Sequence, residues 1–269
     1  SGTVDVLARN GDEIARRAGR AIKITRAAAR SLNKVRDCEL SGIALTTDGM
    51  EVATAPDVDV VAELIGGTAQ AREFVMAAIE HGKHVVTANK ALIALHGNEV
   101  FEQARLKGVM VAFESAVAGG IPIIKALREG LAGNQIEWLA GIINGTGNYI
   151  LTEMRSGGRD YTEVLAEAQA LGYAEADPTF DVEGIDAAHK LTILASIAFG
   201  HPLQFDKVYT EGISRLSLDD LHYAAELGYR VKHLGIARRT GNGIEMRVHP
   251  TLVPERRLIA NVDGVLNAV

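Results

Sequence analysis

The feature that most constrains the fold is the alternation of short apolar segments with amphipathic segments over the first 118 residues. Strands are expected at residues 21–28, 59–65, 84–88 and 109–114, and helices at residues 4–17, 69–80 and 98–107. Gly82 and Gly108 follow the last two helices, where a helix C-terminus favours glycine. Strands that alternate with helices predict right-handed βαβ units and a parallel sheet covered by its crossover helices.

The sequence from Gly119 onward has a different pattern, so we place a domain boundary near Ala118. The segment AVAGGIPIIKALREGL predicts a glycine-rich turn that leads into an amphipathic helix. Beyond it we expect a strand at residues 136–143, a helix that starts at Tyr149, and helices at residues 162–171 and 185–199. The 269-residue chain is therefore expected to form two domains, residues 1–118 and 119–269.

The charge of the chain narrows the class of its partners. A net charge of −6 and a pI near 5.8 argue against a general affinity for nucleic acid or anionic membranes, which requires clustered Lys and Arg. The basic residues between Arg16 and Arg30 straddle a helix end and a strand, which favours a solvated surface. The single cysteine, Cys38, cannot form an internal disulfide, and neither a signal-peptide pattern nor a long apolar span is present. We therefore expect a cytoplasmic protein whose partners are small molecules.

In a parallel sheet, ligands bind beyond the carboxyl ends of the strands, where helices begin with their positive ends outward. Three short sequences fall at those ends: the pair Gly66 and Gly67, the sequence TANK that ends at Lys90, and Glu114. A glycine pair lets a flat ring or a phosphate approach the backbone, although it also forms ordinary turns. Lys90 is either a site residue or a solvated lysine at the start of a helix.

One part of a dinucleotide-binding domain is missing from this pattern. Such a domain starts with a strand and a G-x-G-x-x-G turn that places a pyrophosphate on a helix N-terminus, whereas this chain enters a helix directly from Ser1. Either the first strand lies outside the given sequence or the nucleotide interpretation is wrong, and the regular pattern that follows favours the first. Gly2 and Thr3 are then expected at the cofactor. Arg30 follows a strand where such enzymes recognise the adenosine ribose, and its charge suits the 2′-phosphate of NADP.

A charged segment, ADPTFDVEGIDAAHK, leads into the helix expected at residues 185–199. At helical spacing Asp186 and Lys190 share a stripe with isoleucines, whereas His189 takes the opposite side and is read as a surface residue. An inward-facing lysine is costly without a carboxylate, and Asp186 lies one turn away. We therefore prefer a site to an exposed salt bridge.

Two neighbouring segments have alternative interpretations. Glu175, Asp177 and Asp181 precede the helix and are either ligands for an ammonium or hydroxyl group or charges favoured by the helix dipole. The sequence NGTGN, residues 144–148, is either a substrate-binding loop or an ordinary capped turn.

The most specific signal runs from Ala168 to Lys190, where about ten positions fit the pattern A-x3-G-Y-x-E-x-D-P-x2-D-V-x-G-x-D-x3-K. This pattern resembles the signature of the homoserine dehydrogenases. The segments ELIGG, VVTANKAL, AVAGGIPIIKALREGL, GIINGTGN and RVHPTLVP are similar to other blocks of that family, in the same order. The resemblance covers residues 4–269.

The resemblance implies an α/β chain with a Rossmann-type nucleotide-binding domain and an α+β substrate and dimerisation domain with a mixed sheet. Members of this family interconvert L-homoserine and L-aspartate 4-semialdehyde by hydride transfer with NADP or NAD, on the route to threonine, methionine and isoleucine. They are usually homodimers or higher homo-oligomers. A partly buried lysine is a suitable acid/base for the alcohol proton.

Site residues are also implied by the resemblance. The catalytic residues would be Lys190 as the acid/base, Lys90 as a second lysine, and Asp186 as their support. The substrate would be held by Glu175, Asp181, Thr146 and Tyr173. The cofactor would be held by Gly2, Thr3, Arg30, Gly66, Gly67, Asn89, Lys90 and Gly172. A monovalent cation, sodium or potassium, would be held by Glu114 and the backbone of Val117, Gly119 and Ile121.

The chain departs from the family pattern at three points. The glycine fingerprint is absent, Gly147 stands where serine is common, and family members continue beyond the sequence NVDGVLNAV. We therefore expect the given sequence to be part of a longer protein. Two alternatives are another two-domain NAD(P) oxidoreductase acting on a different small alcohol or carbonyl, and a non-catalytic regulatory module of the same fold.

Overall fold

The computed structural model describes all residues, 1–269, and the chain divides into two compact units. The first unit contains Ser1–Val86 and Val100–Ala112, and the second contains Thr87–Glu99 and Phe113–Val269. The chain therefore enters the second unit twice. None of its helices is both long enough and apolar enough to cross a membrane.

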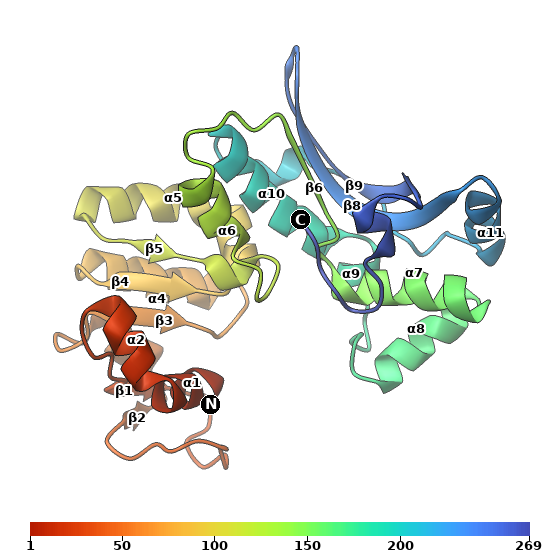
Figure 1. Cartoon of the computed structure of the whole chain (residues 1–269). Helices are drawn as coiled ribbons and strands as arrows, with labels where there is room; N and C mark the ends of the chain where they lie inside the picture. Colours follow the sequence, from red (N-terminus) through yellow and green to blue (C-terminus); the bar gives the residue numbers. More distant parts are fainter. The chain divides into compact units, whose positions relative to one another are not determined.

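The first unit contains the predicted alternation of strands and helices (Figure 1). Strands β3 (Val60–Glu63), β4 (His84–Thr87) and β5 (Val111–Ala112) form one sheet in this order, and β4 and β5 run parallel. Helices α4 (Ala69–Glu80) and α5 (Lys90–Lys107) connect them. Helix α4 buries Ala71, Val75, Ala78 and Ile79. The α/β prediction is confirmed.

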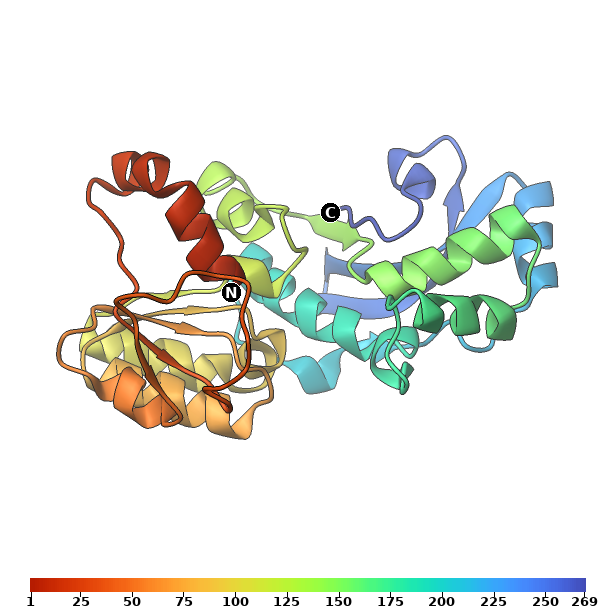
Figure 2. The same cartoon turned by 90° about the horizontal axis from the view of Figure 1, so that it is seen from below.

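The N-terminal region differs from the prediction. The helix expected at residues 4–17 is two helices, α1 (Gly2–Arg9) and α2 (Gly11–Ala18), which meet at an angle (Figure 2). Asn10 and Gly11, both weak helix formers, lie at the break, and neither helix buries a residue. The strand expected at residues 21–28 is only β1 (Arg26–Ala28).

Two elements of the first unit were not predicted. Strand β1 pairs in parallel with β2 (Ala44–Thr46), and α3 (Gly49–Thr54) follows with Asp48 as its N-cap. The start of α5 was also predicted too late, at residue 98. The helix begins at Lys90, and the prediction missed its first turns because they are largely apolar on several sides and so lack amphipathic periodicity.

The second unit is built on a mixed four-stranded sheet, as predicted, in the order β6-β8-β9-β7. Strands β8 (Tyr229–Thr240) and β9 (Gly243–Pro254) form a long antiparallel hairpin. Strand β6 (Trp138–Gly141) is antiparallel to β8, and β7 (Tyr209–Thr210) is parallel to β9. Several helices of this unit pack on the sheet.

The helices of the second unit position the charged segment. Helix α10 (Ile185–Phe199) packs on β8 and β9, and α9 (Thr179–Val182) precedes it. Helices α7 (Gly145–Gly157) and α8 (Tyr161–Ala170) lie side by side (Figure 2). The remaining helices are α6 (Ile123–Lys125) with the π-helical turn η2 (Ala126–Gly130), α11 (Leu218–Glu226), and the 3₁₀ turns η1 (Glu114–Ala116), η3 (Phe205–Lys207) and η4 (Leu258–Asn261).

Helix α10 is buried on all sides, which contradicts the prediction that His189 is a surface residue. His189 is 4% exposed and Thr192 is fully buried. The reason is that the side of α10 that carries His189 is covered by the aromatic rings of Phe180 and Phe205. A helix covered on several sides has no polar face from which its orientation can be read.

Candidate active site

Asp186 is a buried carboxylate that binds two lysines. It lies in the first turn of α10 and is 3% exposed. Its Oδ2 accepts a hydrogen bond from Lys190 Nζ at 2.6 Å, one turn further along α10, and its Oδ1 lies 3.0 Å from Lys90 Nζ at the start of α5. The predicted pairing of Asp186 with Lys190 is confirmed, and the fold brings Lys90 to the same carboxylate.

Asp186 stays ionised because of these neighbours. Burial by itself would raise the pKa of its carboxyl, since a charge in a dry interior is unfavourable. The positive charges of Lys190 and Lys90, with hydrogen bonds from Lys190 and Asn144, outweigh burial, so the pKa of Asp186 is lowered. The centre therefore contains one carboxylate and two amines.

Asn144 links this carboxylate to a second one. Its Nδ2 donates to Asp186 Oδ2 at 2.9 Å and to Asp181 Oδ1 at 2.8 Å, which uses both amide hydrogens. Its Oδ1 accepts a hydrogen bond from the Gly147 amide at 2.7 Å and so caps α7. This cap explains why α7 begins at Gly145 and not at Tyr149, as predicted.

Lys190 has a second fixed partner, the carbonyl oxygen of Ile143, which lies 2.7 Å from Nζ. Its side chain is 17% exposed. An ammonium has three N–H donors, and two of them are directed at Asp186 and Ile143. The third position is free, and in the neutral amine this position holds the lone pair. Lys190 can therefore give up or accept one proton while both anchoring hydrogen bonds remain.

Lys90 is positioned by the first turn of α5. The amide of Asn89 donates to Thr87 Oγ1 at 2.9 Å, and Asn89 Oδ1 accepts from the Leu92 amide at 3.0 Å, so Asn89 acts as an N-cap. The Lys90 side chain is 34% exposed, and its Nζ lies 5.9 Å from the centre of the Phe180 ring. Its position in an ion pair excludes the interpretation of Lys90 as a solvated lysine.

His189 lies beside the charged centre without a polar partner at Nδ1. Its ring lies 4.3 Å from that of Phe205 and 5.5 Å from that of Phe180, centre to centre. Burial lowers the pKa of His189; the charge of Asp186 acts against this and that of Lys90 adds to it. The imidazole is therefore neutral near pH 7.

Three of the four predicted substrate residues belong to two separate hydrogen-bonded groups. Thr146 Oγ1 donates to the Tyr173 carbonyl at 2.7 Å, and the Tyr173 ring packs edge-on against Tyr149. Gly172, with φ +77°, ends α8 just before Tyr173. Asp181 belongs to the Asn144 network. The remaining residue, Glu175, has an exposed side chain that no hydrogen bond or ion pair joins to these groups.

In the first unit, the Gly66 and Gly67 pair forms an open turn. Both residues have positive φ, 72° and 70°, and a Cβ at either position would meet nothing within 4 Å. The buried carboxylate of Glu63 accepts hydrogen bonds from the Ile65 amide at 2.9 Å and the Gly66 amide at 3.3 Å. Sequence reasoning missed Glu63, although a carboxylate that ends an apolar strand is an available signal.

Arg30 borders a basic hollow of about 660 Å³ in the first unit. The hollow is lined by Ser1, Arg30, Ser31, Lys34, Val35, Arg36 and Asp37. The guanidinium of Arg36 donates to the carbonyls of Ser31, Leu32 and Lys34, so it is tied to its own loop. Gly2 and Thr3 are exposed in the first turn of α1.

The carboxylate of Glu114 is tied to backbone amides. Its Oε1 accepts from Ile124 at 2.9 Å and its Oε2 from Lys125 at 3.0 Å, which anchors the start of α6. The loop between them contains Ala118, the one residue other than glycine with positive φ, followed by Gly119, also with positive φ. Of the other predicted cation ligands, Val117 is buried, and Ile121 accepts a hydrogen bond from the Ile123 amide at its carbonyl.

The group formed by Asp186, Lys190 and Lys90 is named here the lysine centre, and two of its partners could not be predicted from the spacing of residues. Asn144 was noted only as part of a polar loop, and its contacts with Asp181 and Asp186 span 37 and 42 residues of sequence. The Ile143 carbonyl is a backbone group, so no residue type identifies it.

Comparisons with known proteins agree on one family. A family model described as "Homoserine dehydrogenase" matches residues 122–269, and one described as "Homoserine dehydrogenase, NAD binding domain" matches residues 1–114. The homoserine dehydrogenase of Pseudomonas aeruginosa is 69% identical over 268 residues, which is 100% of this chain and 61% of that protein. The chain thus spans about three fifths of the length of this curated relative.

Solved structures give the same result. The crystal structure of a homoserine dehydrogenase from Thiobacillus denitrificans is 66% identical, has a TM-score of 0.96, and aligns over 99% of this chain and 62% of that one. A hyperthermophilic archaeal homoserine dehydrogenase in complex with NADPH is 25% identical, has a TM-score of 0.72, and aligns over 96% of this chain and 71% of that one.

Proposed function

The chain belongs to the homoserine dehydrogenase family, and from this premise we propose that the protein interconverts L-homoserine and L-aspartate 4-semialdehyde by hydride transfer, with NADP or NAD. One observation carries the proposal: Lys190 and Lys90 share the buried carboxylate of Asp186, and Lys190 keeps one position of its amine free. Oxidation of an alcohol releases a proton as well as a hydride, and a lysine so arranged can receive that proton.

In this mechanism Lys190 acts as the acid/base. In the oxidation direction the neutral amine takes the proton of the substrate hydroxyl, while the carbon that bears this hydroxyl loses a hydride and becomes the aldehyde. A bound nicotinamide would supply the acceptor for this hydride. The anchors at Asp186 and Ile143 hold Lys190 Nζ in place, and its conversion to an ammonium strengthens both hydrogen bonds. The reverse direction returns the proton to the carbonyl oxygen.

The other members of the centre orient the substrate. Lys90, on the other oxygen of Asp186, is suited to bind the substrate oxygen or to stabilise the charge that develops on it. Glu175 is a free carboxylate suited to the substrate ammonium group, and Thr146, Tyr173 and Asp181 are assigned to the substrate with it. The residues assigned to the cofactor are Gly2, Thr3, Arg30, Gly66, Gly67, Asn89, Lys90 and Gly172.

Turnover of L-homoserine by the full-length protein tests this function. We expect Lys190→Met, which keeps the length of the side chain, to lower kcat by a factor of about 10² to 10⁴, because the acid/base is lost. Lys207→Met is the matched control, because Lys207 pairs with Asp206 at the surface and is expected to leave kcat unchanged. Unchanged turnover in Lys190→Met would remove Lys190 from the mechanism, and an inactive wild-type protein would favour a regulatory module.

The cofactor is proposed to be NADP. The basic hollow beside Arg30 supports this choice, because Arg30 and Lys34 are free to bind a phosphate whereas Arg36 is tied to its loop. The archaeal relative solved with NADPH is consistent with it. We expect Arg30→Ala to lower kcat/KM with NADP by about 10- to 100-fold and to change kcat/KM with NAD little. Arg16→Ala is the control, because Arg16 pairs with Glu13 on α2; equal losses with both cofactors would contradict the assignment.

A monovalent cation site is proposed at Glu114. Each oxygen of this carboxylate accepts one hydrogen bond and keeps further lone pairs, and the neighbouring loop has two consecutive residues with positive φ. Carboxylate and carbonyl oxygens suit a hard cation such as sodium or potassium. Glu114 and the carbonyls of Val117, Gly119 and Ile121 would supply the ligands. A homodimer or higher homo-oligomer and a cytoplasmic location are further proposals from the family resemblance.

A further inference from the structure

Residues 258–269, named here the C-terminal segment, lie against α7 with little regular structure of their own. The segment begins with η4. Beyond this turn it forms one isolated β-bridge, in which Ala268 and Ile142 exchange backbone hydrogen bonds of 2.8 and 3.0 Å. Leu258 and Leu266 in the segment are largely exposed. Ala260, Ile259 and Val262 pack in an apolar cluster with Ile142, Leu234 and Val253, and the segment beyond Val262 is held largely by polar contacts.

One stripe of α7 supplies many of these contacts. Residues 145, 148, 152 and 155 are spaced three, four and three apart, so they share one side of the helix. Asn148 Nδ2 donates to the carbonyls of Val262 and Leu266, and Thr152 Oγ1 accepts from the Gly264 amide. At Gly145 a Cβ would lie 2.8 Å from the Val265 carbonyl oxygen, so the segment passes too close for any side chain.

Lys232 joins the segment to α7 from the sheet. It lies in β8, is 1% exposed, and is the largest of the fully buried side chains. Its Nζ donates to Val262 O at 2.6 Å, to Asp263 Oδ1 at 2.9 Å, and to Asn148 Oδ1 at 3.2 Å. All three ammonium donors are thus used, two of them on the C-terminal segment and one on α7.

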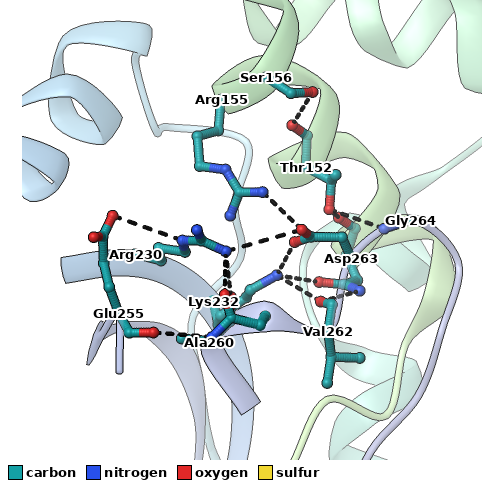
Figure 3. A network of polar contacts seen from close by, with 12 residues as sticks. Thr152, Arg155, Ser156, Arg230, Lys232, Glu255, Ala260, Val262, Asp263 and Gly264 are labelled. Atoms are coloured by element: carbon teal, nitrogen blue, oxygen red, sulfur yellow. Dashed lines mark hydrogen bonds and ion pairs between the residues drawn. The ribbon is translucent and has the colours of Figure 1, made fainter. Parts of the chain in front are cut away.

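Asp263 is the centre of a wider group of charges (Figure 3). Arg155, which lies on α7, donates to Asp263 Oδ2 at 2.9 Å. Arg230, which lies on β8, is 4.0 Å from the same oxygen. Burial lowers the pKa of Lys232, against the effect of Asp263. A buried ammonium without partners would destabilise the fold, and the hydrogen bonds to the three fixed acceptors offset this desolvation cost.

Residues 142–145 contact both the C-terminal segment and the lysine centre. Ile142 bridges to Ala268, whereas the next carbonyl, that of Ile143, accepts from Lys190. Asn144 then holds Asp186 and Asp181, and Gly145 touches the C-terminal segment. Residues 142–145 therefore contact the C-terminal segment and also the lysine centre, to which Ile143 supplies one of the two anchors of Lys190.

We propose that Lys232 is a positioning residue of the lysine centre: its buried ammonium fastens the C-terminal segment to α7 and thereby holds residues 142–145 against Lys190 and Asp186. No other charge can replace it, because Arg155 and Arg230 reach Asp263 but neither reaches Asn148 or Val262. The kinetic consequence rests on the proposed function, whereas the structural consequence does not.

The structural arm is hydrogen exchange in the full-length protein, comparing wild type with Lys232→Met. Methionine keeps the apolar length of lysine and removes the three donors. We expect amides of residues 142–148 and of Ala268 to exchange at least tenfold faster, because the Asn148 and Val262 acceptors lose their donor. Met154→Ala is the matched control, since Met154 is buried in an apolar cluster that includes α7 and α8 and is not among the hydrogen-bond partners of Lys232.

The kinetic arm uses the same two variants, at a temperature at which both are folded. We expect Lys232→Met to lower kcat for L-homoserine by about 10- to 100-fold and to shift the pH midpoint of kcat, with the KM for the cofactor unchanged. We expect Met154→Ala to lose thermal stability while its kcat changes by less than threefold and its pH midpoint stays in place.

The outcomes separate the two proposals. Wild-type exchange rates at residues 142–148 in Lys232→Met would overturn the positioning role, and so would an equal loss of kcat with an equal pH shift in Met154→Ala. A wild-type protein without turnover counts against the proposed function alone, because the exchange arm still decides the role of Lys232.

Discussion

At the scale of single residues, the polar atoms of the lysine centre are matched almost completely to partners. Asp186 receives hydrogen bonds or ion pairs from Asn144, Lys190 and Lys90, and Asn144 uses both amide hydrogens and its oxygen. The imidazole of His233, on β8, is different: its Nε2 faces the Glu211 carbonyl, so Nε2 carries the hydrogen and the buried Nδ1 is an acceptor without a donor.

The pairing of the Asp186 carboxylate with two lysines and Asn144 predicts a pH-dependent contribution to stability. Because the pKa of Asp186 is lowered in the folded chain from its value of 3.8, its ionised form stabilises the fold fully above about pH 4, and this stabilisation is lost as the pH falls below 3.8. We expect Asp186→Asn to lower the free energy of unfolding at pH 7 by about 3 kcal/mol. Urea unfolding at pH 7, 5 and 3 measures it; the difference from wild type should shrink at pH 3, and a constant difference would contradict the charge-based explanation.

The unmatched His233 Nδ1 predicts a stabilising substitution at Gly147. A Cβ at position 147 would lie 3.7 Å from this nitrogen and 3.3 Å from Asn144 Oδ1, so a serine hydroxyl can donate to His233 after a small shift. We expect Gly147→Ser to raise the free energy of unfolding by about 1 kcal/mol in urea unfolding. Gly147→Ala is the control for helix propensity; if alanine stabilises as much as serine, the hydroxyl does not reach His233.

At the scale of elements, α10 depends on a glycine at each end. Gly184 precedes it with φ +81° and Gly200 follows it with φ +69°. Both require the left-handed conformation, yet their surroundings differ. A Cβ at Gly184 would lie 3.0 Å from both His233 and Val248, whereas a Cβ at Gly200 would meet nothing within 4 Å.

This difference predicts unequal effects of alanine at the two ends of α10. We expect Gly184→Ala to lower the free energy of unfolding by about 2–4 kcal/mol, because backbone strain and a steric clash add together. Gly200→Ala is expected to cost about 1 kcal/mol from strain alone. Thermal and urea unfolding of both variants measure the costs, and equal losses would show that the clash at Gly184 is relieved by a shift of the sheet.

Sequence reasoning at this scale succeeded where the periodicity and the helix ends were both clear. Helices α4 and α10 have the predicted bounds, because glycines with positive φ follow them and their apolar residues recur at helical spacing. It failed at the start of α5 and at the surface of α10. In both places burial on several sides removes the polar face on which the periodicity depends.

At the scale of the whole molecule, two buried histidines make stability depend on pH. Burial lowers the pKa of both His189 and His233 from 6.5, so both are neutral in the folded chain and bind a proton more readily when it unfolds. Their stabilising contribution is therefore complete above pH 6.5 and is lost as the pH falls below 6.5. Acid destabilisation should begin well before Asp186 titrates.

We expect the free energy of unfolding to fall by up to about 1.4 kcal/mol per pH unit for each histidine between pH 6.5 and 5.5. The double variant His189→Gln and His233→Gln should show a flatter dependence in urea unfolding at pH 7.5, 6.5 and 5.5. The control is His222→Gln, because His222 is exposed on α11. An unchanged slope in the double variant would place the pH dependence elsewhere.

The α/β class, the pairing of Asp186 with Lys190 and the family could all be read from the amino-acid sequence, because local periodicity and residue types at fixed spacing are present in the chain before it folds. The mixed sheet of the second unit was expected only from the family resemblance. The fold was needed to bring Lys90 and Asn144 to the same carboxylate, to bury His189, and to place the Lys232 ammonium against the C-terminal segment. Each of these contacts joins segments far apart in sequence or depends on what covers a helix, and neither property is present in the spacing of the residues.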